Sequence, residues 1–110
     1  MDAAQTARLE QSAELFKALG HPMRLAMLEK LKGQPWCVCD IASSLGLNKS
    51  IASKHLSQLH DVGLLDVEKQ GTKVIYTLAA PELVDLGAIG QEALAKQKLR
   101  REGQRSTAPA

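Results

Sequence analysis

Residues 47–65 read Leu47-Asn-Lys-Ser-Ile-Ala-Ser-Lys-His-Leu-Ser-Gln-Leu-His-Asp-Val-Gly-Leu-Leu65, and this segment decides the fold of the chain. On a helix of about 100° per residue it has two unlike faces. One face is mostly apolar and holds Ile51, His55, Leu59 and Val62, flanked by Ala52 and Leu56. The other is small, hydroxylated and basic and holds Ser50, Ser53, Lys54 and Ser57. Because hydroxyl and ammonium groups bond to base edges and phosphates, the second face predicts a helix that lies in the DNA major groove.

The residues before this segment predict the first half of a helix-turn-helix. A short helix with one buried face is indicated by apolar residues at i, i+3, i+4 and i+7, namely Val38, Ile41, Ala42 and Leu45. Gly46 ends this helix, and Asn48 is the predicted N-cap of the next. A short helix, a turn containing glycine and a second helix with a polar outer face are typical of a helix-turn-helix.

Beyond the segment the periodicity changes to two, which predicts a β-hairpin. Residues 65–68 alternate apolar and acidic side chains, residues 69–72 form a turn, and residues 73–78 alternate again. The tip of this hairpin carries Lys69 and Lys73.

Helices are also predicted at both ends of the chain. A helix over residues 4–19 ends at Gly20, which we expect in the left-handed conformation of a C-cap. Pro22 takes the first position of the next helix, whose inward residues are Leu25, Leu28 and Leu31. A last helix runs from Pro81 to about Arg100 and is expected to bury Leu83, Leu86, Gly90, Ala93 and Leu94. Glycines within this helix cost about 1 kcal/mol each, so we expect another backbone to approach it closely.

The order α-α-α-α-β-β-α predicts a mainly α fold with a small β-hairpin, a winged helix-turn-helix. Residues 1–102 are expected to form one DNA-binding and dimerisation domain, and residues 103–110 a disordered tail. The first and last helices have more apolar surface than one small domain covers. They are therefore predicted to form the interface of a two-fold homodimer, which places two reading helices on half-sites one turn of DNA apart.

Composition narrows the function classes. The net charge of +2 is too small to indicate a polyanion partner by itself, so DNA binding needs two copies or many non-ionic contacts. Neither a signal peptide nor a membrane span is visible, so we expect a cytoplasmic protein without a membrane partner. In that reducing compartment, Cys37 and Cys39 favour metal binding or redox chemistry over a structural disulfide. No catalytic triad, phosphate loop or carboxylate pair can be assembled, which argues against an enzyme.

Four motifs in residues 15–78 carry a family resemblance. They are Phe16-Lys-Ala-Leu-Gly-His-Pro-Met-Arg24-Leu, Cys37-Val-Cys39-Asp40-Ile-Ala, Ser50-Ile-Ala-Ser53-Lys-His55-Leu56 and Gly71-Thr-Lys-Val-Ile-Tyr76-Thr-Leu78. Together they resemble the ArsR/SmtB family of bacterial metal-sensing transcriptional repressors. The resemblance implies a homodimer that binds palindromic operator DNA, holds no tightly bound cofactor, and releases the DNA when an inducer binds.

The resemblance also implies an inducer site on the helix that begins Cys-Val-Cys-Asp, with departures in this chain. Arsenic-sensing members often carry a third cysteine where Ala42 stands here. Cadmium- and lead-sensing members add cysteines near the N-terminus, and residues 1–36 contain none. The family's zinc site on the final helix uses histidine, which the final helix of this chain lacks.

Cys37 and Cys39 are the candidate metal ligands. Within a regular helix, residues i and i+2 point about 200° apart and cannot hold one ion. They can if Cys37 lies at the cap, which Pro35 before it and Asp40 after it permit. Two thiolates favour a soft ion, As(III) or Sb(III) ahead of Cd(II) or Pb(II), with a third donor from a small thiol, the other subunit or a histidine. The alternative is that both are small buried hydrophobes.

The candidate DNA contacts are Lys49, Ser50, Ser53, Lys54 and Ser57 on the helix and Lys69 and Lys73 on the hairpin. The alternative is an ordinary solvated face. His55 shares its side of the helix with Ile51 and Leu59 and is predicted to be a hydrogen-bonded interior histidine. Arg24 could reach either phosphate or a neighbouring carboxylate, and the sequence leaves both open.

The leading hypothesis is a homodimeric repressor that releases its operator when a thiophilic metal or metalloid binds Cys37 and Cys39. A second hypothesis keeps the DNA binding and makes the same cysteines a redox or reactive-sulfur switch. A third, from another class, is a protein-interaction module, which predicts no salt-dependent affinity for duplex DNA.

Overall fold

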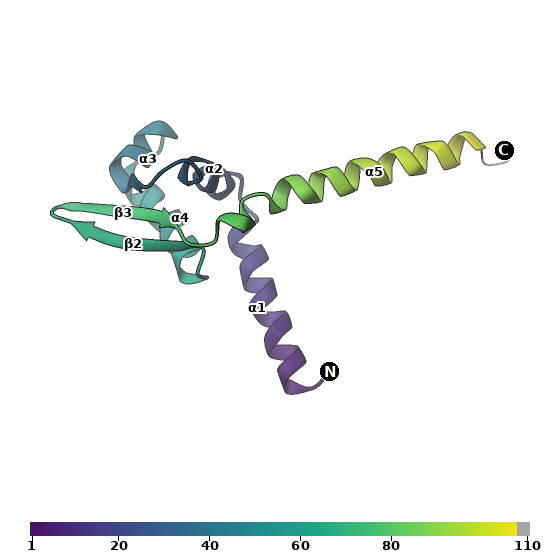
Figure 1. Cartoon of the computed structure of the whole chain (residues 1–110), viewed down its shortest axis with the longest axis horizontal. Helices are drawn as coiled ribbons and strands as arrows, with labels where there is room; N and C mark the ends of the chain where they lie inside the picture. The colour runs from purple at the N-terminus through teal and green to yellow at the C-terminus, as the bar shows by residue number, and fades with distance from the viewer. Residues whose placement is uncertain (108–110) are drawn as a thin grey trace.

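The computed structural model describes residues 1–107, with side chains described through residue 104. A helical body carries a small antiparallel sheet, and two long helices project from it (Figure 1). In chain order the elements are α1 (Ala3–Leu19), α2 (Pro22–Leu31), β1 (Trp36–Cys37), α3 (Val38–Ser44), α4 (Lys49–Asp61), β2 (Leu65–Gln70), β3 (Lys73–Leu78), the 3-10 helix η1 (Pro81–Leu83) and α5 (Leu86–Thr107).

The core lies where α2, α3, α4 and the start of β2 meet. Its largest fully buried side chains are Met27, Leu28, Ile41, Leu56, Leu59 and Leu64. Each stabilises the fold by about 1.5–3 kcal/mol relative to an exposed side chain. Leu28 and Leu31 point inward as predicted, but Leu25 is 40% exposed. Met27 occupies the inner position instead, because α2 turns the Met27–Leu31 side, rather than Leu25, towards α4.

The turn between α3 and α4 forms as the sequence predicts. Gly46 has a φ of 68°, a left-handed conformation that glycine adopts without steric cost. The Asn48 side chain then caps α4, since its Oδ1 accepts a hydrogen bond of 2.8 Å from the backbone N–H of Ile51. These two residues fix the angle at which α4 leaves α3.

The inner face of α4 differs from the predicted one. Its fully buried residues are Ala52, Leu56 and Leu59, at i, i+4 and i+7. Ile51 is 46% exposed and His55 is half-buried. Ala52 and Leu56, which were predicted to flank the apolar face, therefore pack on the core. Ile51, which was predicted to lie within that face, lies at the edge of the polar face.

The predicted hairpin is present and gains a third strand. Strands β2 and β3 pair from Leu65↔Leu78 to Gln70↔Lys73, and Gly71 at the turn has a φ of 64°. Strand β1 pairs with β3 through Trp36↔Tyr76 and Cys37↔Ile75. The sequence pattern did not predict β1, because two residues are too few to show a period of two.

The turn between α1 and α2 corrects the predicted left-handed cap. Gly20 has a φ of −80°, and its N–H donates to the carbonyl of Lys17 over 3.4 Å. A Cβ there would lie 3.2 Å from the carbonyl oxygen of Phe16, a tight contact that glycine avoids. Pro22 opens α2 as predicted, and the His21 ring caps it, with Nδ1 accepting from the N–H of Met23 over 3.1 Å.

The last helix is the largest departure from the prediction. Pro81 opens only the short η1, and α5 starts separately at Leu86 and continues to Thr107, beyond the predicted end at Arg100. Residues 103–107, predicted as a disordered tail, continue α5, and residues 108–110 lie outside the described residues.

Within one chain, α5 buries little of its predicted face. Gly90, Ala93 and Leu94 are exposed, Leu94 by 65%, while Leu83 and Leu86 are half-buried against the core. A Cβ on Gly87 or Gly90 would meet nothing within 4 Å. The close backbone approach predicted from these glycines is thus absent within the single chain.

Helices α1 and α5 extend well beyond the core (Figure 1). The radius of gyration is 18.5 Å, against about 13 Å expected for a compact chain of this length. The two helices carry a set of exposed large apolar side chains, Leu9, Phe16, Ile89, Leu94 and Leu99. Across the described residues, none of the helices is both long and apolar enough to span a bilayer.

Candidate nucleic-acid interface and cysteine pocket

The polar face of α4 is presented to solvent. Lys49, Ser50, Lys54 and Ser57 are exposed, and Ser53 is half-buried. Together with the exposed Ile51, this surface has no acidic side chain until Asp61 at the end of the helix. It is a basic and hydroxylated surface on a helix held rigidly by the core.

The hairpin places further cations near the start of α4. Lys69 and Lys73 are both exposed, on β2 and β3 respectively. Lys73 and Lys49 line the same pocket, so one hairpin lysine lies near the N-terminal end of α4. Lys69 pairs in register with Val74 and does not line that pocket.

The pocket between α3, α4 and the hairpin has a volume of about 350 Å³. Three segments distant in the sequence form it, and its lining residues are Cys37, Val38, Cys39, Asp40, Lys49, Thr72, Lys73 and Val74. Both candidate metal ligands therefore border one space together with two of the candidate DNA contacts. We call this space the cysteine pocket.

Cys37 lies at the cap position that the sequence permits. It is the N-cap of α3, with φ −78° and ψ 155°, and its extended backbone belongs to β1. The 200° separation of residues i and i+2 in a regular helix therefore does not apply to Cys37 and Cys39. Cys37 is buried and Cys39 is exposed, and neither forms a disulfide. Cys37 makes no side-chain capping hydrogen bond.

The donor set around the two thiols is small. Among the described residues, no group of three or more histidine, cysteine, aspartate and glutamate side chains is placed to hold a metal ion. The chain thus offers two soft donors at the cysteine pocket, which fit a thiophilic ion, and leaves further positions to a donor from elsewhere.

His55 is hydrogen bonded inside the helical body, as the sequence predicts. The Nε of Arg24 donates to its Nδ1 over 3.1 Å, and the His21 ring lies 4.6 Å away between centroids. Burial lowers the pKa of His55, and the positive charges of His21, Arg24 and Lys54 lower it further. Because Nδ1 accepts this hydrogen bond, the imidazole is in its neutral form.

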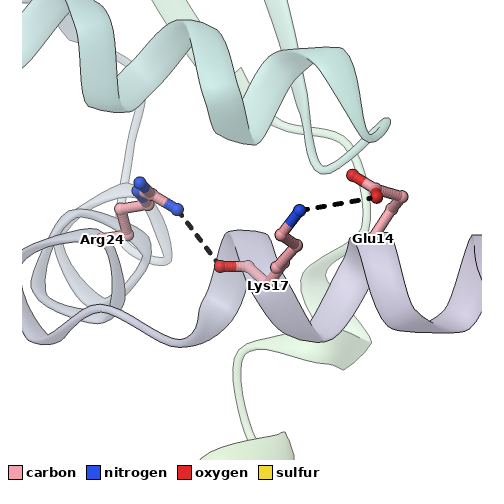
Figure 2. Close-up of polar contacts among 3 residues, drawn as sticks. All are labelled: Glu14, Lys17 and Arg24. Atoms are coloured by element: carbon pink, nitrogen blue, oxygen red, sulfur yellow. Dashed lines mark hydrogen bonds and ion pairs between the residues drawn. The ribbon is translucent and has the colours of Figure 1, made fainter.

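Arg24 joins three helices. Its Nη1 donates to the carbonyls of Lys17 and Ala18 at the end of α1, over 3.2 and 3.1 Å, while its Nε reaches His55 on α4. Figure 2 shows the bond to Lys17, whose own ammonium pairs with Glu14 at 3.9 Å. The partners of Arg24 are thus backbone carbonyls and an imidazole. They are neither the phosphate nor the carboxylate that the sequence left open. No sequence pattern connects Arg24 with a histidine 31 residues away.

A second pocket, which the sequence did not indicate, lies beside Arg24. It has a volume of about 340 Å³ and is lined by Glu14, Lys17, Ala18, Arg24, Gln58, Asp61 and Val62. The Oε1 atom of Gln58 is buried without a hydrogen-bond partner. Two acidic and two basic side chains line this pocket, so its charge favours no one class of ligand.

Comparison with known proteins gives a consistent result. The model of the arsR family of bacterial regulatory proteins matches residues 21–67. The HTH-type transcriptional regulator Rv0081 of Mycobacterium tuberculosis is 36% identical over 85 residues, which cover 76% of this chain and 75% of that protein. A transcriptional repressor SmtB homolog of Synechocystis is 35% identical over 77 residues, 70% of this chain and 58% of that protein.

A solved structure agrees with the fold. The homodimeric winged helix-turn-helix DNA-binding domain of Mb0332 from Mycobacterium bovis, a possible ArsR-family transcriptional regulator, matches with a TM-score of 0.75 and 30% identity. The match covers 87% of this chain and 89% of that one. These relatives are regulators of transcription and not enzymes, as the sequence predicts for this chain. The chain belongs to the ArsR family of winged helix-turn-helix, DNA-binding transcriptional regulators.

Proposed function

We propose that the chain is a homodimeric cytoplasmic repressor that releases operator DNA when a thiophilic ion binds Cys37 and Cys39. The preferred inducers are As(III) and Sb(III), followed by Cd(II) and Pb(II). The observation that best supports this proposal is the cysteine pocket. Both cysteines line it together with Lys49 at the start of α4 and Lys73 on the hairpin. An ion captured there shares a pocket with groups that contact DNA.

The DNA contacts are the exposed polar groups of α4 and the hairpin. Ser50, Ser53, Lys54 and Ser57 contact bases or phosphates at the major groove, and Lys49, Lys69 and Lys73 bind backbone phosphate. Their side chains are exposed except that of Ser53, which is half-buried. Because the chain carries a net charge of only +2, two copies are needed to accumulate enough phosphate contacts.

The second copy binds through α1 and α5. These helices expose Leu9, Phe16, Ile89, Leu94 and Leu99, an apolar set that one chain leaves uncovered. The Mb0332 domain, which matches over most of this chain, is homodimeric. A two-fold dimer presents two α4 helices to a palindromic operator.

Ion capture acts on the elements that bind DNA. Cys37 belongs to β1, which pairs with β3 of the hairpin, and Cys39 belongs to α3, which packs beneath α4. Drawing the two sulfurs onto one ion changes the first turn of α3 and the hairpin together. The dimer then holds its two α4 helices at a spacing that no longer fits the operator.

A titration of the reduced protein with arsenite and with cadmium tests this proposal. Thiolate-metal absorbance and release of a fluorescent operator are followed in the same samples. We expect one ion per protomer and release at the same midpoint. The Cys37→Ser, Cys39→Ser double variant serves as the control and should bind the operator without responding. Retention of DNA by the reduced wild type at saturating concentrations of both ions contradicts the proposal.

A redox function of the same cysteines is the second candidate. It is favoured by the exposure of Cys39 and by the lack of a third donor among the described residues. In this case peroxide or persulfide releases the operator while arsenite and cadmium do not. The two functions are separated by treating the protein with each reagent under argon and measuring operator binding.

A further inference from the structure

The cysteine pocket is much larger than a bare ion. Its volume of about 350 Å³ corresponds to roughly ten water molecules at about 30 Å³ each. An arsenic atom bound to two sulfurs at one end fills only part of it. The remainder reaches from α3 to Lys49 on α4 and to Thr72 and Lys73 on the hairpin.

The charge of that remainder favours an anion. Lys49 and Lys73 are cationic and exposed, and Asp40 is the acidic residue among those lining the pocket. Neither lysine has an ion-pair partner among the described residues, where the lysines that form ion pairs are Lys17 and Lys32. Both ammonium groups are therefore available to a carboxylate that enters the pocket.

The coordination at the two thiols is also incomplete. Trivalent arsenic binds three thiolate sulfurs. The described residues supply two thiols, with no third metal donor beside them. In the balanced reaction, arsenous acid and three thiols give an arsenic trithiolate and three waters. Because the chain has only two cysteines, the third thiol must come from another molecule.

We propose that the third ligand is a small thiol that carries carboxylates, and that Lys49 and Lys73 bind those carboxylates in the cysteine pocket. This inference rests on the proposed function and adds the chemical class of the co-ligand to it. The inducer that the protein recognises is then arsenic together with an anionic thiol. Recognition depends on two lysines as well as on two cysteines.

The same lysines connect co-ligand binding to DNA release. Lys49 and Lys73 are proposed to bind phosphate in the operator complex, so a carboxylate in the pocket competes with DNA for them. Linkage requires that the co-ligand weakens DNA binding by the same factor by which DNA weakens co-ligand binding. An anionic thiol should therefore release the operator at lower arsenite concentration than a neutral thiol.

The test compares arsenite binding in two thiols, glutathione as the anionic probe and 2-mercaptoethanol as the neutral one. The arsenite Kd of the DNA-free protein is measured in each thiol at equal ionic strength, and the ratio of the two values is taken. The same ratio is measured for Lys73→Gln and Lys49→Gln. In a given thiol, competition for arsenite by the free thiol is the same for every protein variant, so it cancels when the ratios of the variants are compared.

We expect the preference for glutathione to fall on the order of three-fold in each lysine variant, as for an exposed ion pair. Lys69→Gln removes the same charge from the hairpin outside the pocket and should retain the wild-type ratio. Native mass spectrometry of the wild type should show one arsenic and one glutathione per protomer.

The outcomes separate this inference from the proposed function. Equal ratios in wild type and both pocket variants, or bound arsenic without glutathione, overturn the co-ligand and leave arsenite sensing intact. Failure of arsenite to bind the cysteines in either thiol overturns arsenite sensing and the co-ligand together, and failure of cadmium as well overturns the proposed function.

Discussion

His55 shows how a single side chain can depend on the electrostatics of its neighbours. It accepts a hydrogen bond from Arg24, contacts the ring of His21, and has Lys54 beside it on α4. Arg24 and Lys54 are positively charged. Protonation of His55 therefore adds a further positive charge beside them and turns the accepting Nδ1 into a donor that faces another donor.

This arrangement predicts that the protein loses stability in mild acid. Burial and its positive neighbours hold the pKa of His55 below its ordinary value of 6.5, so the unfolded chain binds the proton first as the pH falls. The contribution of His55 to the free energy of unfolding should be constant above pH 6.5. It should decline as the pH falls from 6.5 through the lowered pKa. Urea unfolding between about pH 8 and about pH 5 measures the effect. The His55→Gln variant keeps an acceptor without titrating, and an equally steep decline in that variant would assign the effect to other groups.

Arg24 is the matching donor, and its geometry makes lysine a poor replacement. The guanidinium serves the Lys17 and Ala18 carbonyls and His55 at once, and a single ammonium cannot reproduce that planar fork. We expect Arg24→Lys to lower the free energy of unfolding by about 1–2 kcal/mol. Lys17→Gln breaks an exposed ion pair on the same turn and should cost at most about 0.5 kcal/mol. Equal losses in chemical denaturation of the two variants would show that the bonds of Arg24 contribute nothing specific.

At the scale of the element, α4 combines a predictable start with a less predictable rotation. Asn48 and Gly46 fix where the helix begins, through a capping side chain and a left-handed glycine that a short stretch of sequence is enough to predict. Which face of α4 turns inward depends on its packing against α2, α3 and β2. That packing places Ala52 rather than Ile51 in the core. The periodicity identified the polar face correctly but misplaced the centre of the apolar one.

Local chemistry also explains what was predictable at the cysteine pocket. Pro35 and Asp40 permitted Cys37 to act as the N-cap of α3, and it does. Its pairing with Ile75 and the nearness of Lys49 and Lys73 arise from contacts between distant segments. Those contacts depend on the pairing of β1 with the hairpin, and a strand of two residues is too short to show a sequence pattern.

The exposed face of α4 leads to a prediction about DNA binding. Lys54 lies at the middle of the helix and is exposed, so we expect Lys54→Ala to weaken operator binding. Loss of one phosphate contact reduces the slope of log K against log salt by about 0.9 per protomer. Fluorescence anisotropy at several salt concentrations measures both values. Lys17→Ala, on α1, is the charge-matched control, and a slope for Lys54→Ala equal to that of the control would show that Lys54 does not contact phosphate.

At the scale of the whole molecule, the described residues of one chain leave apolar side chains of α1 and α5 uncovered. The core of α2, α3, α4 and the hairpin satisfies the apolar pattern of the sequence within a single copy. The patterns of α1 and α5 predicted burial as well, yet Phe16 is 60% and Leu94 65% exposed. Sequence periodicity indicates that a face is to be buried, and it cannot distinguish a face covered by the same chain from one covered by another.

A dimer through α1 and α5 accounts for both helices, and Phe16→Glu tests it. Each buried apolar side chain contributes about 1.5–3 kcal/mol, and a two-fold interface contains each residue twice. The dimer dissociation constant should therefore rise at least on the order of a hundred-fold, with loss of cooperative operator binding. Val67→Glu adds the same charge at a 43% exposed site on the hairpin, distant from α1 in the sequence, and should leave the dimer intact. Sedimentation velocity over a range of protein concentrations gives the result. If Phe16→Glu and Val67→Glu dimerise equally well, the exposed face of α1 has another use and the pairing of half-sites must come from elsewhere in the chain.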